Sequence, residues 1–370
     1  MGALPISVVI PAYNASAYLA EALESVRGQT AQPTEVIVVD DGSTDATAAI
    51  ARAAGATVLS QPNRGISGAR NAGIRAATQP WIAFLDADDL WEADKLRAQW
   101  LAAEACPDVG AVFTNFIEFD TKGQIGVPFF SRIPHYHKLM GTRIGPNVLR
   151  CDHRSLQEQF FQGNFIAPST LLVRRLLLLQ VGLFDVTLSH CEDRECWLRL
   201  ITGSSMAAVE TPLSRSRIQA GNWSRNSLQM LLGAIMVTDR ILVSPDRYPS
   251  GAAEHYRKLR PDLYVAAGRV AEDAGDIRRA REYYLQGWRL GSGVRALALT
   301  SLSLLPGPIR SVARAVRRRL SLTTTSVAAT PTGRMSCSIG SLNHSPSSTS
   351  SLECASKAAR SPRSPAREWH

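Results

Sequence analysis

The stretch EVIVVDDGSTD, residues 35–45, joins a continuous apolar run to two aspartates and a glycine. The apolar run 36–39 predicts a strand covered on both faces, which is typical of a parallel sheet. The stretches SVVIPAYN (7–14) and WIAFLDADDL (81–90) follow the same plan, an apolar run that ends in polar residues. Three strands with polar carboxyl ends therefore form the frame of the predicted fold.

The segments between these strands have helical patterns. In residues 19–26 the apolar positions recur at i, i+3, i+4 and i+7, and Ser16 is placed to cap this helix. A second helix is expected from Ser43 or Thr44 to Ala54, a short strand at 57–59, and a third helix from NRGISGARNAGI (63–74). Because strand and helix alternate with short connections, we expect an α/β fold with a Rossmann-like, mostly parallel central sheet flanked by helices. Such sheets bind ligands beyond the carboxyl ends of their strands.

The middle of the chain is less regular. Residues 112–119 and 164–173 resemble strands, and residues 174–181 and 191–201 resemble helices. Between the two strands, residues 120–160 mix Pro, Gly and His, and we expect a long, partly ordered insertion there.

The C-terminal part changes character. Residues 264–275 and 277–290 predict two helices joined by a Gly-Asp turn, which resembles one unit of tetratricopeptide type. Residues 321–370 contain thirteen Ser and six Thr and predict a disordered tail. The expected organisation is a sheet domain at 1–225, a helical extension at 226–320 with the tetratricopeptide-like unit near 262–290, and the tail at 321–370.

Composition limits the classes of function. The chain has 370 residues, 45% of them apolar, and a net charge of +9. Without the last fifty residues the net charge is +6, which argues against a nucleic-acid-binding surface. No secretory signal, CxxC pair or span of about 18 apolar residues is present, so we expect a cytoplasmic protein. Five arginines within 310–319 leave open a peripheral contact with the inner face of the membrane, the alternative being a solvated helix.

The acidic cluster that ends WIAFLDADDL carries the first chemical hypothesis. Asp86 and Asp88 are two residues apart and point to the same side of an extended chain, about 6.5–7 Å apart. One divalent cation can recruit both carboxylates, and Mg²⁺ or Mn²⁺ with few protein ligands usually completes its shell with substrate phosphates. The alternative is a solvated acidic turn, with Asp89 capping the next helix.

The order of the motifs SVVIPAYN, EVIVVDDGSTD, NRGISGARNAGI and WIAFLDADD resembles family 2 glycosyltransferases with the nucleotide-diphospho-sugar (GT-A) fold, over residues 5–225. The resemblance implies that the first and second strand ends hold the base and ribose of a nucleotide-sugar, that the ARN segment lies against it, and that the DxD aspartates hold its diphosphate through Mg²⁺ or Mn²⁺. The implied nucleotide-sugar-binding residues are Pro11, Tyr13, Asp40, Asp41, Arg70 and Asp86, and the implied metal ligands are Asp86 and Asp88.

Each of these residues also has a purely structural interpretation. Tyr13 would pack on the first helix, Asp40 or Asp41 would cap the second helix, and Arg70 would form a surface ion pair.

The resemblance also implies a catalytic base in CEDRECWLRL, residues 191–200. We expect Asp193 to take the proton of the acceptor hydroxyl, with Glu192 as the second choice. Structurally, both acids also favour a helix N-terminus. The chain departs from the family at Arg194 and Glu195, which change the charge around the base, and at Gln219, where histidine is common.

The expected function is that of an inverting, metal-dependent glycosyltransferase. It would move a sugar from a nucleotide-diphosphate sugar, a UDP-sugar by preference, to a glycan or lipid-linked acceptor in cell-surface polysaccharide synthesis. A nucleotidyltransferase would need a Gly-rich, basic signature near the first strand, which PAYN lacks. A degenerate GT-A fold that only binds a nucleotide-sugar or a partner predicts lost acids, whereas the four key acids are present: Asp41, Asp86, Asp88 and Asp193.

Overall fold

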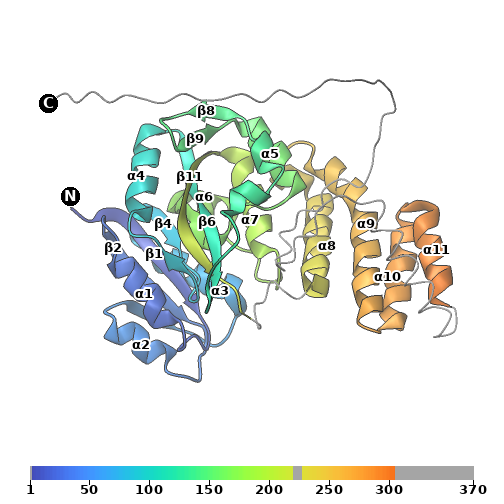
Figure 1. Cartoon of the computed structure of the whole chain (residues 1–370), viewed down its shortest axis with the longest axis horizontal. Helices are drawn as coiled ribbons and strands as arrows, with labels where there is room; N and C mark the ends of the chain where they lie inside the picture. The colour runs from blue at the N-terminus through green and yellow to red at the C-terminus, as the bar shows by residue number, and fades with distance from the viewer. Residues whose placement is uncertain (1, 220–226, 305–370) are drawn as a thin grey trace, which may run out of the picture. The chain divides into compact units, whose positions relative to one another are not determined.

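The computed structural model describes residues 2–219 and 227–304. Within them lies one mixed sheet with the order β3-β2-β1-β4-β10-β6-β11-β9-β8 (Figure 1). The first four strands in this order are mutually parallel, as the alternation of strands and helices predicts. Their bounds are β1 (Leu4–Ala12), β2 (Pro33–Asp40), β3 (Thr57–Ser60) and β4 (Trp81–Phe84).

The second half of the sheet begins with one antiparallel strand. β10 (Leu171–Arg174) pairs antiparallel with both β4 and β6 (Val109–Asp120), and β11 (Ser205–Arg217) then runs parallel to β6. Four short strands complete the sheet: β5 (Leu90–Trp91), β7 (Gly123–Ile125), β8 (Gly141–Arg143) and β9 (Val148–Cys151).

Two apolar cores cover the two faces of the sheet, because alternate residues of a strand point to opposite sides. In β1, Val8 and Ile10 join one cluster with Leu19 of α1, whereas Val9 joins the other cluster with Ile74 of α3. The expected α/β architecture is confirmed. The helices around the sheet are α1 (Leu19–Arg27), α2 (Thr47–Ala53), α3 (Gly65–Ala76), α4 (Lys95–Ala105), α5 (His153–Gln162), α6 (Arg175–Val181) and α7 (Glu192–Gly203).

Two predicted helix starts are wrong. The backbone N–H of Ser16 donates to Asp45 (3.0 Å), and Tyr18 occupies the N-cap of α1. α2 begins only at Thr47, because Asp45 accepts hydrogen bonds from the backbone N–H (2.9 Å) and the hydroxyl (2.5 Å) of Thr47. The residues between β2 and α2 therefore form a longer loop than the sequence pattern predicts.

The segment 120–160 is more regular than expected. It contains β7, β8, β9, most of α5 and two short 3₁₀ helices, Phe129–Arg132 and Tyr136–Lys138. Aromatic side chains anchor it to the core: the rings of Phe130 and Tyr136 stack with their centroids 3.9 Å apart. Conversely, of the predicted strand 164–173 only the last residues form β10, which continues to Arg174.

Helices α8 (Ser227–Val243), α9 (Ala252–Asp273), α10 (Ile277–Arg289) and α11 (Gly293–Ser303) form the C-terminal described part. The predicted helix pair is present as α9 and α10 (Figure 1). α9 begins earlier than expected because it continues through Pro261, a residue that usually ends a helix, with buried Tyr256 and Leu263 on either side. Gly268 allows the close approach of α10: a Cβ at this position would lie 2.5 Å from the ring of Tyr284.

Two predictions fall outside the described residues, namely the basic segment 310–320 and the disordered tail 321–370. In the part of the chain that the structure describes, none of the helices combines the length and apolar character needed to cross a membrane.

Candidate functional site

The polar carboxyl ends of β1, β2 and β4 meet at one edge of the sheet. In the parallel register, Ala12 lies beside Asp40, and the backbone N–H of Asp41 donates to the carbonyl of Ala12 (2.8 Å). On the other side of β1, Val9 lies beside Phe84, so Pro11 comes level with the residues that follow β4. The polar ends of SVVIPAYN, EVIVVDDGSTD and WIAFLDADDL are therefore neighbours at this edge.

The loop after β1 presents an aromatic ring to solvent. Tyr13 is 54% exposed, as a ring that stacks on a nucleobase would be. The next residue, Asn14, has a positive φ of 48° and ties this loop to the one after β2. Its backbone N–H donates to the hydroxyl of Ser43 (2.9 Å), and its side-chain oxygen accepts from the backbone N–H of Thr44 (2.9 Å). Asn14 therefore fastens the loop after β1 to the loop after β2.

The two aspartates at the end of β2 are buried and fixed within loops. Asp40 accepts from the backbone N–H of Ser43 (3.1 Å). Asp41 accepts from the side chain of Gln61 (2.6 Å) and from the backbone N–H of Arg64 (2.9 Å), which attaches it to the β3–α3 loop. Neither aspartate is the N-cap of α2, where Ala46 stands. The capping interpretation is thus wrong, and the nucleotide-binding one stays a prediction.

Arg70 joins two parts of the site that are far apart in the sequence. Its side chain is 1% exposed, and its guanidinium donates to Asp86 Oδ1 (2.8 Å) and to Glu192 Oε1 (2.8 Å). Burial opposes the charge of Arg70, but the two carboxylates more than offset it and raise the pKa of the guanidinium. Arg70 therefore forms two ion pairs as a buried side chain, and the alternative of a surface ion pair is wrong. Direct contact of Arg70 with a ligand stays a prediction.

Asp86 and Asp88 stand in the turn that follows β4, and both are half-buried. The side chain of Gln219 donates to Asp88 Oδ2 (3.2 Å), so the residue in place of the family's histidine touches the acidic turn. Arg217 donates to the backbone carbonyl of Asp88 (3.0 Å) and pairs with Glu21 (2.7 Å). Arg217 therefore supports the turn from β11.

Asp89 does not cap the next helix, because α4 has Asp94 at its N-cap. The side chain of Asp89 is 4% exposed and accepts hydrogen bonds from other segments instead. These come from the hydroxyls of Ser169 (2.7 Å) and Ser216 (3.1 Å) and from the backbone N–H of Arg217 (3.0 Å). The third acid of the cluster is thus a buried acceptor between β11 and the segment before β10.

The N-terminus of α7 carries the expected base. Asp193 is half-buried, and its Oδ2 accepts from the side-chain amide of Asn164 (2.9 Å). Its neighbour Glu192 is buried against Arg70. The geometry therefore favours Asp193 over Glu192 as the group that meets an acceptor. The contact between Asn164 and Asp193 was not predicted, because no sequence pattern links a loop residue before β10 to a residue in the first turn of α7.

The two departures that follow the acidic pair point away from the base. Arg194 donates to the carbonyl of Phe161 (3.1 Å), and its guanidinium lies 5.5 Å from the ring centroid of Tyr256 in α9. Glu195 accepts from Tyr248 (2.7 Å) and forms a buried ion pair with Arg199 (2.5 Å). Both charged groups thus bind partners other than Asp193, and their effect on the charge around the base stays a prediction. They attach α7 to the C-terminal helices.

The residues after β4 fit a hard divalent cation in ligand type, since they offer two carboxylates two positions apart at the edge where the strands end. No group of three or more His, Cys, Asp or Glu residues able to hold a metal occurs among the described residues. One divalent cation could take the carboxylates of Asp86 and Asp88 as ligands.

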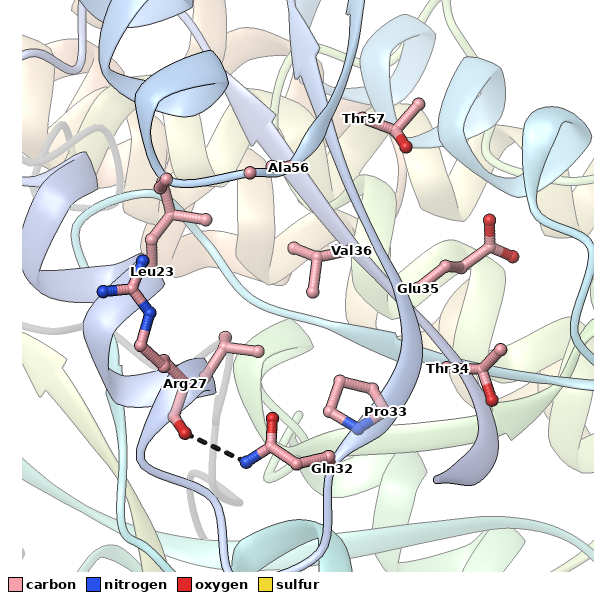
Figure 2. Close-up of a pocket in the computed structure, with 12 residues that line it drawn as sticks. Leu23, Arg27, Gln32, Pro33, Thr34, Glu35, Val36, Ala56 and Thr57 are labelled. Carbon is pink, nitrogen blue, oxygen red and sulfur yellow. Dashed lines mark hydrogen bonds between the residues drawn. The ribbon is translucent and has the colours of Figure 1, made fainter. Parts of the chain in front are cut away.

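A pocket of about 350 Å³ opens at the opposite, amino-terminal edge of the sheet (Figure 2). Pro33 and Thr57, near the starts of β2 and β3, line it together with Arg27 at the end of α1. Glu35 also lines it and accepts from the hydroxyl of Ser7 (2.5 Å). None of the predicted site residues belongs to this pocket.

Comparisons with known proteins agree on one family. Residues 7–160 match the family model "Glycosyl transferase family 2". An uncharacterized glycosyltransferase of Rickettsia felis is 30% identical over 254 residues, 65% of this chain and 37% of the relative, so the chain spans little more than a third of that protein. The succinoglycan biosynthesis protein ExoO of Rhizobium meliloti is 42% identical over 104 residues, 27% of this chain and 30% of the relative.

Solved structures share the fold at low sequence identity. S. aureus TarS 1–349 in complex with UDP-GlcNAc superimposes with a TM-score of 0.58 at 17% identity, covering 85% of this chain and 92% of that one. The mannosyltransferase PcManGT from Pyrobaculum calidifontis, in complex with GDP-Man and Mn²⁺, gives a TM-score of 0.50 at 19% identity, with coverage of 86% and 87%. Residues 7–160 are thus similar to glycosyl transferase family 2, and the described residues share the GT-A fold of these solved structures.

Proposed function

We propose that this chain is an inverting, metal-dependent transferase that moves a sugar from a nucleotide-diphosphate sugar to a hydroxyl of a glycan or lipid-linked acceptor. The observation that carries the proposal is the Arg70 bridge, which holds Asp86 and Glu192 on one guanidinium. Asp193, next to Glu192, is thereby kept close to the acidic turn. A donor held at the turn and an acceptor activated by Asp193 would meet at this edge of the sheet.

The donor side combines a stacking ring with acidic anchors. The exposed ring of Tyr13 would stack on the base, and Pro11, Asp40 and Asp41 would shape the base and ribose site at the ends of β1 and β2. The similar structures that hold UDP-GlcNAc or GDP-Man support a nucleotide-sugar donor, and we take a UDP-sugar as the first candidate.

Asp86 and Asp88 would hold Mg²⁺ or Mn²⁺ together with the donor diphosphate. The Mn²⁺ in the similar mannosyltransferase structure supports such a cofactor. When bound, the ion would supply Lewis-acid stabilisation of the departing nucleoside diphosphate. In the ion pair, the guanidinium of Arg70 binds only Oδ1 of Asp86. Arg70 would therefore hold this carboxylate in place and leave its other oxygen for the cation.

The acceptor side is the N-terminus of α7. Asp193 would take the proton of the acceptor hydroxyl as that oxygen attacks the sugar from the face opposite the leaving diphosphate, which inverts the anomeric centre. The amide of Asn164 would fix which carboxylate oxygen meets the acceptor, since it donates to Oδ2 (2.9 Å).

The wider role is proposed from the relatives. ExoO is a succinoglycan biosynthesis protein, which supports a role in polysaccharide synthesis. We place the transferase in residues 1–225, with residues 226–320 as a helical extension and 321–370 as a tail. A cytoplasmic location, with peripheral contact at the membrane, remains part of this proposal.

The test is transfer or hydrolysis of a panel of UDP-, GDP- and dTDP-sugars with Mn²⁺, using the full chain. Asp88→Ala should abolish donor turnover. Asp193→Asn should retain binding of the Mn²⁺–nucleotide-sugar complex but lose transfer, because the amide cannot accept the proton. Asp108→Asn is a matched control, since this exposed carboxylate pairs with Arg150 and lies outside the predicted site.

Two outcomes would refute the proposal. If no nucleotide-sugar binds in a metal-dependent way, the donor assignment is wrong. If Asp193→Asn transfers sugar at the rate of the unchanged chain, another group is the base.

A further inference from the structure

One residue outside the acidic turn contacts it at two points. Ser169 lies in a short 3₁₀ helix, Pro168–Thr170, directly before β10. β10 is the antiparallel neighbour of β4 with Leu172 opposite Ala83, and continuing this register brings Ser169 opposite Asp86. The fold therefore places this side chain where β4 ends and the turn begins.

The hydroxyl of Ser169 makes two hydrogen bonds with the turn. It accepts from the backbone N–H of Asp86 (3.0 Å) and donates to Asp89 Oδ2 (2.7 Å). A serine hydroxyl has one donor and two acceptor positions, so both bonds form at the same time. The backbone N–H of Asp89 also donates to the carbonyl of Asp86 (3.0 Å). The hydroxyl thus joins the first and the last residue of the DADD sequence.

Ser169 is itself held from two further sides. Its carbonyl accepts from the indole N–H of Trp91 (2.8 Å) and from the hydroxyl of Ser214 in β11 (3.0 Å). Ser169 and Ser214 are buried, and Asp89 also accepts from the hydroxyl of Ser216 and the backbone N–H of Arg217 in β11. Partners that order a ligand residue can change metal affinity by about 10- to 100-fold when removed.

On the basis of the proposed function, we infer that Ser169 is a positioning residue for the donor site. It sets the backbone direction at Asp86 and fixes Asp89 as a buried anchor, so that Asp86 and Asp88 face a cation together. Asp89 is an anchor and not a third ligand. The segment around Ser169 thus acts on the donor side.

The experiment compares Ser169→Ala with Ser214→Ala, which removes a hydroxyl from the same buried network without touching Asp86 or Asp89. Mn²⁺ binding in the presence of UDP is followed by electron paramagnetic resonance, and amide hydrogen exchange is measured over residues 86–89. We expect Ser169→Ala to weaken Mn²⁺ binding by about tenfold and to speed exchange in the turn. Ser214→Ala should change neither, and Ser169→Thr, which keeps the hydroxyl, should restore both.

The two readouts separate this inference from the proposed function. If the unchanged chain does not bind Mn²⁺ with UDP, the proposed function fails. Amide hydrogen exchange in the turn then decides by itself whether Ser169 positions the turn. If Ser169→Ala leaves exchange in the turn as slow as in the unchanged chain, the inference is wrong. Should Ser169→Ala not fold, Ser216→Ala gives a milder test of the same turn. It removes one hydrogen-bond donor to Asp89 and leaves the contacts of Asp86 untouched.

Discussion

Replacing Arg70 tests the bridge on which the proposed function rests. Arg70→Met keeps most of the apolar stem but leaves Asp86 and Glu192 facing each other without their shared cation. Removing one partner of a buried ion pair costs about 3–5 kcal/mol, since a buried charge is left uncompensated. Because Asp86 is 26% exposed and Glu192 only 11%, we assign most of this cost to Glu192 and expect a loss of about 3 kcal/mol in the free energy of unfolding.

Arg70→Lys should lose less. An ammonium is a point charge that cannot reach two carboxylates in the fixed fork of a guanidinium, so one of the two charged hydrogen bonds is lost. A hydrogen bond to a charged group contributes about 1.5–3 kcal/mol, and the expected loss lies in this range. Donor hydrolysis with Mn²⁺ should fall in both variants, because Asp86 loses its support.

Urea unfolding of the full chain, followed by tryptophan fluorescence, measures these losses. Arg75→Met is the matched control, since Arg75 lies in the same helix with an exposed side chain and should change stability by less than about 0.5 kcal/mol. If Arg70→Met is as stable as Arg75→Met, the two ion pairs do not hold the site together, and the reasoning fails.

Three further changes test other parts of the structure by urea unfolding. Tyr248→Phe removes the hydroxyl that donates to buried Glu195 (2.7 Å) and should cost about 1.5–3 kcal/mol; no loss would show that α7 does not depend on this contact. Gly268→Ala places a Cβ 2.5 Å from the ring of Tyr284 and should cost about 1–3 kcal/mol, and unchanged stability would contradict the close packing of α9 and α10. Burial lowers the pKa of Lys95 well below its usual value, so the unfolded chain binds more protons at this group, and the contribution of Lys95 to stability should rise with pH up to about 10.4. Lys95→Met should remove this contribution, which stability curves at pH 7 and pH 9.5 would show by a smaller rise in the variant.

The sheet and its parallel half were predictable because local patterns determine them. Each of the apolar runs at the starts of 7–14, 35–45 and 81–90 became a buried strand, and each ended at the same edge. Helix starts were less predictable. Asp45 holds the start of α2 at Thr47 through a contact only two residues away, whereas Ser16 is held outside α1 by Asp45, a contact between two loops. A sequence window cannot show such a contact.

The candidate site was predictable as a set of residues but not as a set of contacts. The resemblance to family 2 pointed to Asp86 and Asp193, but not to the guanidinium that joins Asp86 to Glu192 or to the amide of Asn164 on Asp193. The partners of Arg194 could not be predicted for the same reason. Position in the motif placed Arg194 near the base, whereas its guanidinium extends to α9.

The acidic turn and the N-terminus of α7 are coupled through a single side chain. Any change in the charge of Asp86 alters how strongly Arg70 is drawn to Glu192, because one guanidinium serves both carboxylates at 2.8 Å. Residues that share a partner in this way show non-additive effects, of about 0.5–3 kcal/mol. A cation that recruits Asp86 would therefore be felt at α7, and removing Asp86 and Glu192 together should cost more than the sum of the two single losses, because the buried Arg70 then has neither of the two carboxylates. Additive losses would mean that the donor and acceptor sides act independently despite their common arginine.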